Sequence, residues 1–313
     1  MDHRETDDVD VRSVAYLVGG MACFGTATPV SAIVGRSFPA FLGSFGRMAV
    51  AAAVLVPIHA MAVRRRDERP AGETAAGLGR ADWARLVVIA AVGTFGFSIL
   101  MLSGMRLAPG AVASVVMATT PAVTAVGAVA FLGDRLGRWR LLGLALAVGG
   151  VVVVNLGADI TDGTGDEVVL GAALVFAAVC CEATYSLTGK RLSADLSPLQ
   201  IVTAAAVLAS VLFLPFAIRD IRSFGVGEPT VGEWIALGWW GAGTMALGSW
   251  LWFRGMRRVA AGTAAAFMAV MPVSALIGSY VLLGEAVEVV HFVGMAISLA
   301  GLAAVIRSGA AVH

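Results

Sequence analysis

The chain contains the stretch GMRLAPGAVASVVMATTPAVTAVGAVAFLG at residues 104–133, and a variant of it, GMRRVAAGTAAAFMAVMPVSALIGSYVLLG, at residues 255–284. Continued to residue 150, the first copy has 13 identities in 47 ungapped columns with the residues 151 positions later. Abundant Ala, Gly and Val inflate chance matches, but the paired Pro121 and Pro272 and the two Met-Arg pairs are rarer. We therefore predict an internal repeat that organises the whole chain.

Composition places this repeat in a membrane. The 313 residues are 58% hydrophobic and 14% charged, with a mean hydropathy of +0.86, whereas soluble domains carry about 25% charged residues. A helical span needs roughly 20 apolar residues. We predict an all-α polytopic membrane protein with ten transmembrane helices. The expected spans are Val14–Val34, Ala40–Val63, Ala84–Met105, Ala111–Leu132, Leu141–Ala158, Val168–Thr188, Pro198–Ile218, Trp234–Phe253, Gly262–Leu283 and Val290–Ile306.

The basic residues predict the orientation of these spans. With the N-terminus in the cytoplasm, 17 of the 22 Lys and Arg residues fall on inner segments and 4 on outer ones, and Arg47 lies within a span. Cytoplasmic loops carry such an excess of Lys and Arg. We therefore expect a multi-pass protein of the cell membrane with both termini in the cytoplasm.

The repeat predicts that the two halves face opposite ways. Residues 1–158 and 159–313 each hold five expected spans. Because five is odd, the second half enters the membrane from the other side and forms an inverted repeat. Many secondary transporters use this arrangement to build two pseudo-symmetric conformations around one central site.

The stretch from Leu107 to Gly143 resembles the EamA domain of the drug/metabolite transporter superfamily. The resemblance lies in a helix with a mid-span proline, a Leu-Gly-acid turn and a glycine-bearing span that follows. Phe24-Gly25 resembles the aromatic-glycine pair of the first span, although Trp is more usual there, and Arg47 matches an arginine typical of the second span. The resemblance covers nearly the whole chain.

This resemblance implies a ten-span fold with both termini cytoplasmic and a cavity lined mainly by spans 1, 3, 4, 6, 8 and 9. It also implies exchange or export of amino acids, related metabolites or drugs, driven by a proton gradient.

Pro121 and Pro272 lie near the middle of their spans and predict kinks, because proline lacks a backbone N–H and clashes with the carbonyl four residues earlier. The released carbonyls need protein or a water-filled cavity to receive them. We expect both prolines at the substrate cavity, although prolines can also serve packing alone. The neighbouring candidates for the cavity are Thr119, Thr120 and Met271.

Gly25, Thr26 and Pro29 form a second weak point, in the first span. Glycine and proline so close together permit bending or the close approach of a substrate. The alternative is a small-residue face that packs on another helix. We expect all three residues at the cavity.

Glu182 is the strongest single candidate for a functional residue, because it lies in the apolar run VFAAVCCEATYSLTG. A carboxylate costs at least a few kcal/mol in hydrocarbon. It should face the bundle interior, where it can exchange a proton or pair with a substrate amine. A protonated acid bonded to a neighbouring helix is the structural alternative. Tyr185, about one turn on, is expected to hydrogen-bond to Glu182 or to substrate.

Other polar residues have paired functional and structural interpretations. Arg47, roughly 10 Å from the outer edge of its span, can pair with Glu182 or a substrate carboxylate, act in gating, or snorkel. Asp134 and Glu285 follow the repeated Leu-Gly pair and are gate charges or helix caps. Further cavity candidates are the matched Ser98 and Ser249, and Trp250, which otherwise anchors or packs.

Several function classes lack their sequence features. No G-x-S-x-G string, phosphate-binding loop or histidine pair at ligand spacing occurs, so we expect no enzyme, cofactor or metal site. A net charge of +1 without a basic stripe predicts no nucleic-acid partner. The expected partners are a small-molecule substrate and membrane lipid, with a homodimer left open.

The function predicted from these features is secondary transport, most simply export, of small zwitterionic or neutral metabolites, coupled to protons. An organic-anion or nucleotide-sugar exchanger is the alternative within transport, but it would want several buried cations. A non-transporting membrane scaffold is the alternative from another class.

Overall fold

The computed structural model describes residues 11–65, 77–117, 119–132, 165–192, 196–224, 229–257, 264, 267–268, 270–284, 292–293, 296–297 and 300. The helices of the first half are α1 (Val11–Gly25), α2 (Ala27–Val34), α3 (Ala40–Arg64), α5 (Arg80–Val88), η1 (Ile89–Gly96), α6 (Phe97–Leu107), α7 (Gly110–Met117) and α8 (Thr120–Leu132). Those of the second half are α10 (Gly165–Leu192), α11 (Pro198–Asp220), η2 (Ile221–Ser223), α12 (Val231–Trp239), η3 (Trp240–Gly248), α13 (Ser249–Met256), α15 (Val270–Gly278) and η4 (Ser279–Leu283).

The predicted all-helical membrane class is confirmed for this part of the chain. Five continuous helical segments are long and apolar enough to cross a membrane: Val11–Val34, Ala40–Arg64, Arg80–Leu107, Gly165–Leu192 and Pro198–Asp220. The predicted fifth span lies outside the described residues and the tenth largely so. The count of ten spans therefore remains a prediction.

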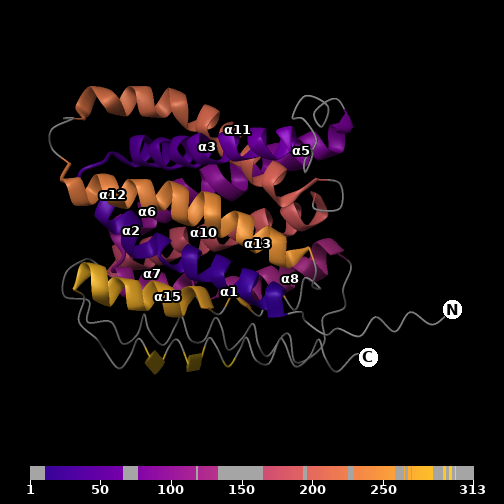
Figure 1. The fold of residues 1–313 in the computed structure, drawn as a ribbon. Coiled ribbons are helices and arrows are strands. Elements are labelled where there is room, and N and C mark those ends of the chain that lie inside the picture. Colours follow the sequence, from indigo (N-terminus) through magenta and orange to yellow (C-terminus); the bar gives the residue numbers. More distant parts are fainter. Residues whose placement is uncertain are drawn as a thin grey trace.

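The helices lie side by side in one bundle (Figure 1), with α3 against α11, and α1 between α13 and α15. Helix α11 shows the force that orders them. Its small residues Ala205, Ala206 and Ala209 are fully buried, while Val211 and Ile218 on its other side are 63% and 55% exposed. An apolar outer face of this kind suits a lipid surrounding, and the small inner residues let the helix backbones approach closely.

The repeat is visible in the helices themselves. α5 and α12 begin at residues 80 and 231, and the π-helical segments η1 and η3 begin at residues 89 and 240. Both pairs are separated by the 151 residues of the sequence repeat. Figure 1 shows the two matched helices running in opposite directions, from α5 to α6 towards the left and from α12 to α13 towards the right. These two matched spans are thus antiparallel, as the predicted inverted repeat requires.

The Leu-Gly-acid turn of the second copy has a clear local cause. Gly284, which follows η4, has a φ of +66°. Glycine adopts this left-handed conformation without a steric cost, and it commonly ends helices. The glycine of the repeated motif therefore terminates its span. The first copy, at Gly133, lies outside the described residues.

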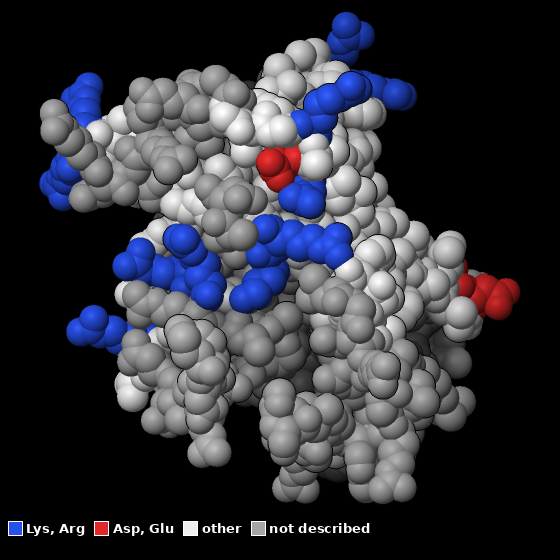
Figure 2. Space-filling view, turned by 90° about the vertical axis from the view of Figure 1, so that its right-hand side faces the viewer, with Lys and Arg blue, Asp and Glu red and all other residues white. Residues whose placement is uncertain are grey.

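Basic residues gather at one end of the bundle. Figure 2 shows this end, where Lys and Arg side chains outnumber the acidic ones that are visible. The described basic residues at this end of the helices are Arg12, Arg64, Arg65, Arg80, Arg85, Lys190, Arg191, Arg254 and Arg257. Those at the other end are Arg36, Arg106, Arg219 and Arg222. The charge asymmetry predicted from the sequence thus corresponds to two distinct faces.

Close packing of η3 on α3 sets the position of the residues between them. A Cβ atom on Gly241 would lie 2.6 Å from the Arg47 carbonyl oxygen and 2.7 Å from Val50 Cβ. Only glycine allows this approach. The same packing brings the Arg47 side chain beside Trp240, the residue before this glycine.

We expect Gly241→Ala to destabilise the protein by about 1–3 kcal/mol, the usual cost of overpacking a well-packed site. The matched control is Gly238→Ala, because no atom lies within 4 Å of a Cβ at Gly238, and alanine favours the helix there. Thermal unfolding in detergent, followed by intrinsic fluorescence, measures both. Equal melting temperatures for the two variants would contradict this account of the packing.

Candidate functional site: a central cavity between the two repeats

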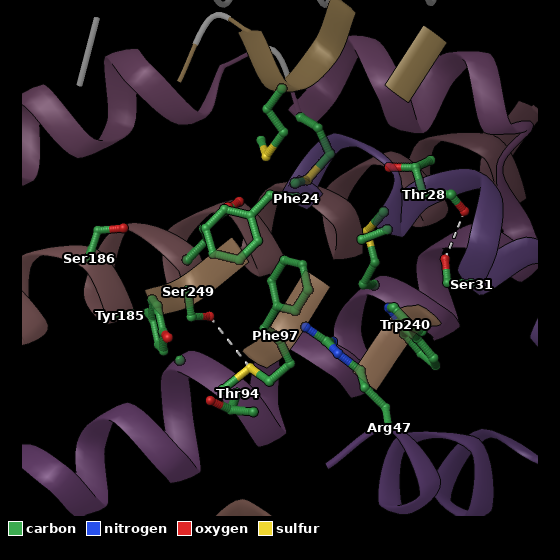
Figure 3. A pocket seen from close by; sticks show the side chains of 17 residues that line it. Phe24, Thr28, Ser31, Arg47, Thr94, Phe97, Tyr185, Ser186, Trp240 and Ser249 are labelled. Carbon is green, nitrogen blue, oxygen red and sulfur yellow. Dashed lines mark hydrogen bonds between the residues drawn. The ribbon is translucent and has the colours of Figure 1, made fainter. Parts of the chain in front are cut away.

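A cavity lies in the middle of the bundle (Figure 3), with about 50 Å³ open to the centres of water molecules. Its lining residues are Phe24, Ala27, Thr28, Ser31, Arg47, Gly93, Thr94, Phe97, Met101, Met117, Glu182, Tyr185, Ser186, Trp240, Met245, Ser249 and Met271. They come from α1, α2, α3, η1, α6, α7, α10, η3, α13 and α15. Both halves of the repeat therefore build its wall.

Most of this wall is apolar. The Phe24 and Phe97 rings project into the cavity (Figure 3), and four methionines complete the surface: Met101, Met117, Met245 and Met271. Methionine side chains are unbranched and polarizable, so they adapt to ligands of different shape. This part of the cavity suits an apolar group of modest size.

Arg47 supplies a cation inside the bundle. Its side chain is only 5% exposed, its Nη1 donates to Ser98 Oγ at 3.3 Å, and its Cζ lies 4.9 Å from the centre of the Trp240 ring. A cation over an indole face is an attractive arrangement. The arginine thus lies among protein groups and lines the cavity, as binding of a substrate carboxylate requires.

Glu182 supplies the opposite charge. The side chain is partly exposed and lines the cavity, and its Oε2 lies 3.5 Å from Thr120 Oγ1. The carboxyl group and Arg47 interact electrostatically, but no ion pair joins them among the described residues. Both charged side chains therefore line the space that a ligand would occupy.

Two of the hydroxyl-bearing lining residues are Tyr185 and Ser249. Tyr185 is buried, and its hydroxyl has no hydrogen-bond partner within the described part of the chain. Ser249 Oγ lies nearby and is directed to Met245 Sδ, at 3.8 Å. Figure 3 shows both side chains at the same side of the cavity. Both residues line the space that a ligand would occupy.

The carbonyl group that Pro121 leaves without a backbone donor is bonded within the chain, and not by the cavity as predicted. The helix breaks between Met117 and Thr120, and the Met117 carbonyl accepts a hydrogen bond of 2.7 Å from Thr120 Oγ1. Thr119 Oγ1 donates likewise to the Val116 carbonyl, at 2.7 Å. In the second copy the Met268 carbonyl accepts from the Met271 backbone N–H, at 3.0 Å. The chain itself therefore receives both released carbonyls.

A second cavity, of about 150 Å³, lies towards the end of the bundle that carries Arg106. Its wall includes Ser31 and Trp240, which also line the central cavity. The two spaces therefore adjoin at these two side chains. We call the second space the outer cavity.

The sequence profile of the EamA-like transporter family matches residues 11–156 and again residues 169–307. The chain belongs to the EamA-like transporter family. The two matches agree with the repeat seen in the helices.

Relatives within the EamA family carry transporter names. An uncharacterized transporter, YetK, of Bacillus subtilis (strain 168) is 33% identical over 287 residues, which are 91% of this chain and 84% of that protein. A probable terminal-alkyne amino-acid exporter of Streptantibioticus cattleyicolor is 26% identical over 222 residues, covering 71% and 72%. A crystal structure with 24% identity covers 94% of this chain and 98% of its own, with a TM-score of 0.67, and shows the same fold.

The structure places the other predicted site residues as follows. Arg47, Glu182, Tyr185, Ser249 and Met271 line the cavity together. Thr120 reaches Glu182 from behind the wall, and Ser98 supports Arg47. The side chains of Pro121 and Pro272 and all of Asp134 and Glu285 lie outside the description.

Three residues of the first span take the packing alternative. A Cβ on Gly25 would lie 2.3 Å from the Met271 carbonyl oxygen, and Pro29 packs against Gly278. Thr26 donates to the Cys23 carbonyl at 2.7 Å and accepts from Trp239 Nε1 at 2.9 Å. The cavity is instead lined by their neighbours on the same helices: Phe24, Ala27, Thr28 and Ser31.

Trp250 packs against other side chains and is not among the residues that line the cavity. Its ring lies edge-on to Tyr16, with centroids 6.2 Å apart, and Arg254 lies 5.2 Å above it. Three aromatic residues that line the cavity were not predicted as cavity residues from the sequence: Phe24, Phe97 and Trp240. The signal for Trp240 lies in the structure: Trp240 and Ile89 begin the two matched π-helical segments, and π segments often occur at functional sites.

The contact between Thr120 and the Met117 carbonyl leads to a stability prediction. Thr120→Val should cost about 1–3 kcal/mol, because a buried carbonyl would lose its donor. Thr124→Val is the matched control, since Thr124 is buried on the same helix and its hydroxyl has no partner among the described residues. Thermal unfolding in detergent should separate the variants, with only Thr120→Val melting lower. Equal losses would show that the hydroxyl bond is unimportant.

Proposed function

We propose that this EamA family member is a proton-coupled exporter of small zwitterionic metabolites, namely amino acids and related compounds. One observation carries the proposal: Arg47 and Glu182 line the same apolar cavity without pairing to each other among the described residues. A zwitterion presents one partner to each of these charges. Neither charge is neutralised locally, so an empty cavity leaves both in an unfavourable environment.

The surroundings of Glu182 support the coupling to protons. Thr120 has a single hydroxyl proton, and its contact with the Met117 carbonyl is 2.7 Å, against 3.5 Å to Glu182. The proton therefore goes to the carbonyl, and the carboxylate is left without a strong donor. A bound proton or a substrate ammonium group would fill this deficit, and the two compete for one carboxylate. Such competition would let the protein exchange a proton for a substrate molecule.

The two alternatives fit the cavity less well. An organic-anion or nucleotide-sugar exchanger needs several cations, and Arg47 is the one basic residue among the described lining residues. A scaffold without transport activity would need neither opposite charges in a shared cavity nor an inverted repeat. The name of the Streptantibioticus relative, a probable terminal-alkyne amino-acid exporter, supports an amino-acid substrate.

The orientation belongs to the same proposal. The basic face in Figure 2 faces the cytoplasm, as the positive-inside rule favours. The protein then spans the cell membrane with both termini inside, and the outer cavity opens towards the exterior. Small metabolites reach the central cavity from the cytoplasmic side and leave by the outer one, by alternating access.

The test is an amino-acid counterflow screen in proteoliposomes, with and without a pH gradient. Glu182→Gln should lower gradient-driven accumulation about tenfold or more, because a charge-assisted contact of 1.5–3 kcal/mol is lost. Glu167→Gln is the matched control: the same substitution on the same helix, at an exposed position. It should leave transport unchanged.

Two results would sink this proposal. One is the absence of counterflow for every amino acid tested. The other is transport by the parent protein that is indifferent to the pH gradient and to Glu182→Gln. Loss of transport in Glu167→Gln as well would assign the effect to folding of α10 and reject Glu182 as the specific group.

A further inference from the structure

Two buried N–H groups at the central cavity have no hydrogen-bond partner among the described residues. They are Nε of Arg47 and Nε1 of Trp240, on side chains that are 5% and 2% exposed. An unpaired buried donor is costly, and native proteins leave few of them. Donors left open at the wall of a cavity point to a ligand that accepts from them.

The two donors lie close to each other. Arg47 Cζ is 4.9 Å from the centre of the Trp240 ring, and the Gly241 contact holds the two backbones together. Ser98 occupies Nη1 of the guanidinium, which leaves the Nε edge unpaired. Figure 3 shows the two side chains beside each other at the cavity.

We propose that Arg47 and Trp240 form a carboxylate subsite, with Trp240 as a specificity-determining residue. Both groups are donors only, so the ligand group must accept. A carboxylate offers two oxygens and a negative charge, and guanidinium groups bind it with strong directional hydrogen bonds. A neutral amide offers one oxygen and no charge, so the subsite discriminates against it.

This inference rests on the proposed function and deepens it, because it names the ligand group that each end of the cavity takes. The carboxylate lies on Arg47 and Trp240, and the ammonium group lies towards Glu182. The methionines and the two phenylalanine rings described above surround the remaining space. The preferred substrate is therefore an α-amino acid with an apolar side chain.

Three related ligands separate these contacts. L-phenylalanine has both charges, L-phenylalaninamide lacks the carboxylate, and 3-phenylpropionate lacks the amine. Their affinities are measured by calorimetry on the purified full-length protein in detergent. Trp240→Phe keeps an aromatic face for Arg47 but removes the N–H donor.

Trp252→Phe is the matched control. Trp252 is also buried, and its Nε1 also lacks a partner among the described residues, but it is not among the residues lining either cavity. Melting curves of both variants verify that they fold. Arg47→Lys is a second variant, which keeps the charge but removes the guanidinium fork.

For Trp240→Phe we expect the affinity for L-phenylalanine and 3-phenylpropionate to fall about tenfold or more, as for the loss of a hydrogen bond to a charged group. The affinity for L-phenylalaninamide should stay unchanged, and Trp252→Phe should affect none of the three. Arg47→Lys should weaken the two acids more than the amide.

The contrary results are distinct. Equal losses for acid and amide in Trp240→Phe would show a structural role and overturn the subsite, even if amino-acid transport holds. No binding of any of the three ligands to the parent protein would also overturn it. Binding of 3-phenylpropionate that depends on Trp240, without transport of any amino acid, supports the subsite while rejecting the zwitterion exporter.

Discussion

The burial of one guanidinium group in an apolar bundle is the constraint that organises the site. A charged side chain in hydrocarbon needs protein partners or a polar cavity. Arg47 has Ser98 on one side and the Trp240 ring on the other, and this requires η3 to pack tightly on α3 at Gly241. The arginine, the indole and the glycine are therefore one structural unit, although Arg47 lies nearly 200 residues before Trp240 and Gly241 in the sequence. Moving any one of them displaces the wall between the two cavities.

The repeat supplies a symmetric frame, and function resides where the two copies differ. The matched π-helical segments η1 and η3 have the same offset as the sequence repeat. Yet Trp240 corresponds to Ile89, and the position 151 residues after Arg47 is Pro198. Even the matched pair differs in role, since Ser249 lines the cavity while Ser98 holds Arg47. Symmetric backbones allow two conformations of similar energy, whereas asymmetric side chains select the ligand.

Hydrophobicity, charge and repetition were enough to predict the all-helical membrane class, the internal repeat and a common cavity for Glu182, Arg47 and Tyr185. The rotation of each helix about its axis was harder to predict from the sequence, because an error of one residue turns the predicted face by about 100°. Gly25 and Thr26 therefore fell on the packing side, while Phe24 and Ala27 beside them line the cavity. The extra residue of a π-helical turn shifts this phase again, and a regular helical pattern does not single out Trp240, which begins the π-helical segment η3 and lines the cavity.

The positions of the charges also favour one direction in the proposed cycle. Arg47 lies seven residues from the start of α3, near the end that carries Arg106, whereas Glu182 lies nearer the opposite end of α10 than its start. A zwitterion bound between them points its carboxylate at the wall formed by Ser31 and Trp240. When that wall opens, the carboxylate enters the outer cavity first. The ammonium group then leaves Glu182, and a proton from outside takes its place. In the proposed cycle, release of this proton to the cytoplasm in the other conformation would let an inward proton gradient drive outward movement of substrate.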